Sequence, residues 1–180
     1  VNDNGAFSFE LLLDDDLLDN VVAVSVTSQT SSRLKYSAVY PGFNRPETTS
    51  TAALVANPEQ SNVATQLSNT VSVNAVSTAL YALLVAANAG EVPMNIEQLV
   101  IVEKSIDADE LTEAAAVVKI LTENAEIALP EGVTDITALL VNIAAYNTIV
   151  EQIEAAQPGL IADTVVAIIA DPTLTPPLTA

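Results

Sequence analysis

Four aspartates near the N-terminus form the densest cluster of oxygen ligands in the sequence: Asp14, Asp15, Asp16 and Asp19, followed by Asn20. Calcium binds six to eight oxygen atoms, so a loop of clustered carboxylates is a candidate calcium site. The spacing differs from that of an EF-hand, which needs a glycine at the sixth position and a glutamate at the twelfth. The alternative is a solvated acidic turn between two strands. We expect no cofactor, and calcium is the one ion that these residues suggest.

The sequence lacks the residues that most enzymes use as a nucleophile or a base. It contains no histidine and no cysteine, which excludes histidine-based triads, thiolate nucleophiles and zinc sites built on those ligands. A serine–lysine pair would have to use Lys35, Lys104 or Lys119. Ser105 directly follows Lys104, but adjacent positions on a helix point in different directions. The five glycines are not clustered, so the sequence has no phosphate-binding glycine pattern. We therefore predict that the chain is not an enzyme.

Positive charges gather in one region that also contains aromatic residues. Arg33, Lys35 and Arg45 account for three of the five Lys and Arg residues and lie close in sequence to Tyr36 and Tyr40. One interpretation is an edge strand that Lys and Arg protect from pairing with other chains. The other is a contact surface for an acidic protein neighbour, including another copy of this chain.

The overall charge excludes several classes of partner. The chain of 180 residues has 23 Asp and Glu against 5 Lys and Arg, a net charge of −18. Nucleic acids and anionic membranes need clustered positive charge, so we expect neither as a partner. The longest apolar run, residues 79–87, is half of the roughly 20 residues that a membrane-spanning helix needs. A carboxylate-rich surface and the absence of cysteine favour an exported bacterial protein, extracellular or at the cell surface, over an acidic cytosolic domain.

Strand patterns dominate the first 40 residues. Phe7, Phe9, Leu11 and Leu13 alternate with the residues between them, which is the period of a half-buried strand. Residues 21–27 and 33–40 predict two further strands, separated by turn-forming residues. The following segment, 46–70, is rich in Thr, Ser, Asn, Gln and Pro and predicts an irregular crossover.

A helical period begins near residue 71. Asn74, Asn95 and Asp107 each stand where a helix N-cap is expected, and a fourth cap falls on Thr134 or Asp135. The first helix lies in a stretch without charged residues, so we expect it to be central in the fold. The predicted helices are 74–89, 95–104, 107–124, 135–156 with a continuous apolar stripe, and 160–170, where helix is favoured over strand.

Strands that come first and helices that follow predict an α+β fold. We divide the chain into a small antiparallel β part at 1–45, the crossover at 46–70, a bundle of four to five helices at 71–170, and an extended tail at 171–180.

Residues 1–9, VNDNGAFSF, resemble the turn and strand of carboxypeptidase-regulatory-like (transthyretin-like) β-sandwich modules. In that resemblance Gly5 makes the turn and Phe7 enters the core of the sandwich. The helical region is similar in composition to regions of exported bacterial surface proteins and lipoproteins. The resemblance implies a non-catalytic structural or binding module.

Sandwiches of this family have strands before the motif, so the resemblance implies an incomplete sandwich. Either the chain is a piece of a larger protein, or the missing strands come from another chain. An incomplete sandwich leaves backbone donors and acceptors unpaired and invites the addition of a strand. The tail at 170–180 is a candidate donor, although its prolines cannot donate ladder hydrogen bonds. We expect a non-enzymatic secreted or cell-surface module with a structural or adhesive role. The alternatives are a filament subunit assembled by strand complementation between copies, and a domain that binds calcium or a small ligand.

Overall fold

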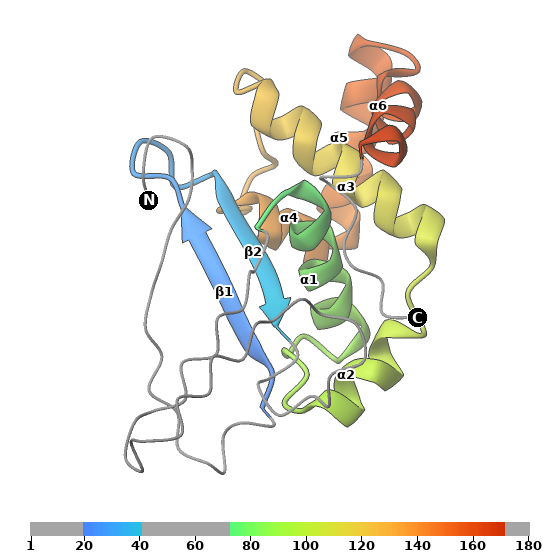
Figure 1. The fold of residues 1–180 in the computed structure, drawn as a ribbon. Coiled ribbons are helices and arrows are strands. Elements are labelled where there is room, and N and C mark those ends of the chain that lie inside the picture. The colour runs from blue at the N-terminus through green and yellow to red at the C-terminus, as the bar shows by residue number, and fades with distance from the viewer. Residues whose placement is uncertain (1–19, 41–72, 172–180) are drawn as a thin grey trace, which may run out of the picture.

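The computed structural model describes residues 20–40 and 73–171. Within these residues a two-stranded antiparallel sheet precedes six helices, which confirms the predicted α+β class (Figure 1). The elements are β1 (Val22–Thr27), β2 (Lys35–Tyr40), α1 (Ala75–Ala87), α2 (Ile96–Glu103), α3 (Ala108–Glu123), α4 (Ile136–Val141), α5 (Ile143–Ala156) and α6 (Leu160–Ala170).

β1 and β2 form a hairpin, as the strand patterns predicted. Val24 lies opposite Ala38 in the antiparallel register, and at the turn the N–H of Ser28 donates to the carbonyl of Leu34 at 2.9 Å. The valines of β1 are half-buried and the residues between them are exposed, which is the alternation expected of a strand with one covered face.

α1 is the central helix, as its lack of charge predicted. The Asn74 side chain accepts from the N–H of Ser77, and the Ser77 side chain accepts from the N–H of Asn74, which completes a capping box. Ala79 and Ala82 are fully buried, and α1 packs against α2, α3, α4 and β2. Ala87, the last residue of α1, is exposed.

α3 supplies more buried residues than any other helix among the described residues. Its N-cap is Asp107, whose carboxylate accepts from the N–H of Asp109 at 2.8 Å and from that of Glu110 at 3.2 Å. Three consecutive alanines, 114–116, are almost completely buried, and small side chains let α1 and α6 approach α3 closely. The large, fully buried core side chains include Leu84, Ile120, Leu121, Ile136, Leu139, Ile149 and Ile153.

The predicted helix over 135–156 is wrong in one respect, because it breaks at Asn142. Asn142 has extended backbone angles, φ −97° and ψ 95°, and ends α4 while its side chain caps α5 by accepting from the N–H of Ala145. An asparagine side chain competes for nearby backbone groups, which favours caps over helix interiors. The predicted apolar stripe is therefore interrupted, and Ile143, just after the break, is 74% exposed. This break accounts for the sixth helix.

Residues 160–170 form a helix, which the sequence pattern favoured over a strand. α6 starts after Gly159, whose φ of 85° is in the left-handed region that glycine adopts easily, and the N–H of Gly159 donates to a Glu154 carboxylate oxygen at 2.9 Å. Ile161 and Ile168 are buried, and α6 packs mainly on α3.

Several predictions fall on residues outside the described part of the chain. They are the strand at 7–13, the crossover at 46–70, Asp14, Asp15, Asp16 and Asp19 of the candidate calcium site, Arg45 of the basic region, and all but the first residue of the tail at 171–180.

Candidate functional site

The two outer edges of the hairpin differ in what covers them. Figure 1 shows β2 lying between β1 and the helices α1 and α4. A strand edge presents unpaired N–H and C=O groups, which either find partners within the fold or remain able to pair with another chain.

Side chains from α1 cover the middle of the β2 edge. The N–H of Ser37 donates to Thr78 Oγ1 at 3.0 Å, and Ser77 Oγ donates to the carbonyl of Ser37 at 3.0 Å. Ser37 and Thr78 are both fully buried. Both backbone groups of Ser37 are therefore satisfied by hydroxyls rather than by a third strand.

The start of α4 covers the part of this edge that precedes Ser37. The N–H of Ile136 donates to the carbonyl of Arg33 at 3.2 Å, and Thr137 Oγ1 lies 3.5 Å from the carbonyl of Lys35. Alternate carbonyls of β2 and of the residues before it thus face helix donors. We call the outer edge of β2, at residues 33, 35 and 37, the covered edge.

The same alternation fixes the direction in which the backbone N–H and C=O groups of β1 point. Since the backbone groups of Ser37 point away from β1, the facing pair Ser25 and Ser37 is a non-hydrogen-bonded pair, and the two hydroxyls lie 2.9 Å apart. The N–H and C=O groups of Ala23, Ser25 and Thr27 consequently point away from β2. Within residues 20–40 and 73–171 they have no backbone partner. We call this outer edge of β1 the open edge.

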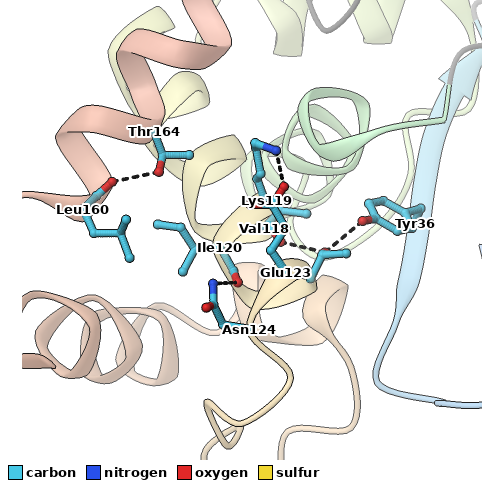
Figure 2. Close-up of polar contacts among 9 residues, drawn as sticks. Tyr36, Val118, Lys119, Ile120, Glu123, Asn124, Leu160 and Thr164 are labelled. Carbon is cyan, nitrogen blue, oxygen red and sulfur yellow. Dashed lines mark hydrogen bonds and ion pairs between the residues drawn. The ribbon is translucent and has the colours of Figure 1, made fainter. Parts of the chain in front are cut away.

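Two residues of the basic region hold the hairpin to α3. Arg33 donates at 2.9 Å to the carbonyl of Leu121, in the last turn of α3 where the helix carbonyls attract positive charge, and at 2.9 Å to the carbonyl of Ala125, just beyond the helix. Burial lowers the pKa of Arg33 from its usual value, and the nearby Glu126 carboxylate opposes that shift. Figure 2 shows Tyr36 reaching toward the end of α3, where its hydroxyl donates to Thr122 Oγ1 at 2.8 Å.

Lys35 and Tyr40, the other described residues of the predicted contact region, lie apart from the contact that Arg33 and Tyr36 make with α3. Lys35 lines an open depression of about 720 Å³, whereas Tyr40 is half-buried at the end of β2. Over the described ranges the ion pair that forms is Lys119–Glu123 within α3, so Lys35 is not paired with a carboxylate there. The depression is lined by Lys35, Tyr81, Val85, Asp135, Thr137, Ala138, Val141, Asn142 and Ile143.

The described residues hold no group of three or more Asp or Glu side chains arranged to bind a metal ion. The predicted calcium ligands are not among these residues. No single described helix is long and apolar enough to cross a membrane; α5 and α6 meet the criterion only together, and they are bent by 102° relative to each other.

Sequence reasoning did not find the difference between the two edges. The covered edge depends on the hydroxyl of Thr78, which is 41 residues from Ser37 in the chain. No local sequence pattern indicates the hydrogen bond between these two residues. Comparisons of the chain with known protein families, with curated proteins and with solved structures find no match.

Proposed function

We propose that this chain is a non-enzymatic structural module of an exported bacterial protein, which joins protein partners by adding a strand to the open edge. The observation that carries the proposal is the asymmetry of the hairpin. One edge is covered by side-chain and backbone donors from two helices, and the other has no backbone partner among the described residues.

The composition of β1 also supports strand addition. Its sequence, VAVSVT, contains no charged residue and no proline, the two devices that most often prevent an edge strand from pairing. Lys35 lies in β2 instead, opposite Thr27. An incoming strand would find three residues whose N–H and C=O groups are correctly spaced for a ladder, at positions 23, 25 and 27.

The placement of the module outside the cell rests on composition. The net charge of −18 keeps an acidic surface soluble in salt, and the chain contains no cysteine. The same charge makes copies repel one another, so we expect association to strengthen as salt screens the repulsion.

The experiment is to measure mass in solution by light scattering at several salt concentrations, for the unmodified chain and for Ala23→Pro. This substitution removes an outward N–H and no hydrogen bond between β1 and β2. Ala23→Thr is the control, because it keeps the N–H. We expect association in the unmodified chain and in Ala23→Thr, and monomers in Ala23→Pro with an unchanged helical circular dichroism signal. Equal association of all three chains would refute the proposal.

A further inference from the structure

We infer that the strand that fills the open edge is residues 7–13 of a second copy of this chain. This inference rests on the proposed function, and it identifies the partner. Three stretches of the sequence lie outside the described structure: 1–19, 41–72 and 172–180. Each is a possible source of an added strand, and their sequences distinguish them.

Proline content and apolar alternation distinguish the three stretches as sources of an added strand. Pro41, Pro46 and Pro58 lie in the second stretch, and Pro172, Pro176 and Pro177 lie in the third. Proline has no N–H to donate, so a strand interrupted by proline pairs poorly. The first stretch contains no proline, and the proline-free runs of the second stretch, 47–57 and 59–72, lack the alternation of apolar residues seen in 7–13. The first stretch therefore replaces the C-terminal tail as the donor that we favour.

The pattern and length of residues 7–13 match the open edge. Phe7, Phe9, Leu11 and Leu13 would lie on one face of the added strand and continue the half-buried face of the β1 valines. The residues between them would continue the exposed face. Seven residues extend about 23 Å and the six of β1 about 20 Å, at roughly 3.3 Å per residue.

The connection between this strand and β1 favours pairing with another copy over pairing within one chain. Pairing within one chain would need the chain to reverse over residues 14–19, which contain four aspartates, and to pass Met94 and Asn95, which pair with residues 20–21 on the same side as the open edge. Carboxylates brought together in a short turn repel one another, and charged linkers extend. The chain is also held where it enters β1, because the N–H of Val21 donates to the carbonyl of Met94 at 3.0 Å and Asn20 bridges to Asn95. An extended connection from a fixed point is the arrangement that leads to exchange of a strand between copies.

The test uses disulfide formation between differently labelled chains. Because the sequence contains no cysteine, any disulfide that forms must join the introduced cysteines. One chain carries Ser25→Cys on the exposed face of β1. The other carries Ser8→Cys, Glu10→Cys or Leu12→Cys, which in the proposed strand would lie on the matching face and together cover the alternative registers. We expect a disulfide between the two chains for at least one pair, and at least a tenfold lower yield when the donor also carries Phe9→Pro. A chain with Thr148→Cys, exposed on α5, is the control acceptor and should give only background crosslinking.

The outcomes separate this inference from the proposed function. If Ala23→Pro abolishes association but no labelled pair crosslinks, the open edge is used and residues 7–13 of another copy do not fill it. If a single chain carrying both Ser25→Cys and Glu10→Cys forms its disulfide internally at high dilution, while separate chains do not crosslink, the strand is supplied within one molecule and the inference is wrong. If Ala23→Pro does not change association, the proposed function itself fails.

Discussion

The backbone N–H of Ser37, at the centre of β2, donates to the side chain of Thr78 on α1 at 3.0 Å, and both residues are fully buried. A helix hydroxyl thus takes the place that a neighbouring strand would occupy in a larger sheet. This relationship ends the sheet on one side and leaves β1 as the strand from which it can grow.

Thr78→Val keeps the shape of the side chain and removes the hydroxyl, so the N–H of Ser37 would be buried without its acceptor. We expect the free energy of unfolding to fall by about 1–3 kcal/mol. Thr148→Val is the matched control, since the Thr148 hydroxyl donates to its own helix at Ala144 on an exposed face. Denaturant unfolding measures both, and equal losses would contradict the role given to Thr78.

Arg33 ties the hairpin to the end of α3 through the carbonyls of Leu121 and Ala125. Arg33→Met retains much of the apolar stem and removes these hydrogen bonds, and we expect a loss of about 1–2 kcal/mol in the free energy of unfolding. Lys35→Met changes the net charge equally without removing an observed ion pair. A loss for Lys35→Met as large as that for Arg33→Met would show that charge, and not these contacts, matters.

Tyr146 is expected to make stability depend on alkaline pH. Burial raises the pKa of Tyr146, and the Glu113 carboxylate, which accepts its hydrogen bond at 3.3 Å, raises this pKa further. The unfolded chain loses the phenolic proton near pH 10 while the folded chain keeps it, so this contribution to stability is complete below about pH 10 and declines above it.

The measurement for Tyr146 is the free energy of unfolding between pH 8 and pH 11, each value obtained at a stated pH from denaturant titration. Tyr146→Phe should flatten the decline above pH 10, and Tyr81→Phe should leave it in place. A decline as steep in Tyr146→Phe as in the unmodified chain would contradict the prediction.

Asn142 separates α4 from α5 by capping the second of them at the N–H of Ala145. Asn142→Ala should lower the free energy of unfolding by about 1 kcal/mol, whereas Asn142→Ser, which retains a capping oxygen, should lower it much less. Thermal unfolding of the two variants under the same conditions measures this difference. Indistinguishable melting temperatures would mean that the cap does not define the break.

Local chemistry made the starts of helices predictable. Asn74, Asn95 and Asp107 cap α1, α2 and α3 as their sequence positions predicted, because a cap depends on the few residues that follow it. The same rule applied to Asn142 places the break, but the apolar stripe on either side of it predicts one helix.

Long-range contacts were beyond prediction from one sequence. Arg33 and Leu121 are 88 residues apart, and neither has a local pattern that marks the contact. Arg33 and Tyr36 were predicted to contact a neighbouring protein or to protect a strand edge. The structure shows that both bind α3 of the same chain. The open edge could be inferred only after the covered edge fixed which backbone groups of β1 point outward.

The most direct test of strand addition at the open edge is amide hydrogen exchange in β1 as a function of protein concentration. In the dilute chain, the N–H groups of residues 23, 25 and 27 should exchange quickly, while those of Val24 and Val26, which pair with β2, exchange slowly. At high concentration and high salt, the three outward groups should become protected together. Protection of those three groups at the lowest concentration, or fast exchange at every concentration, would contradict the account.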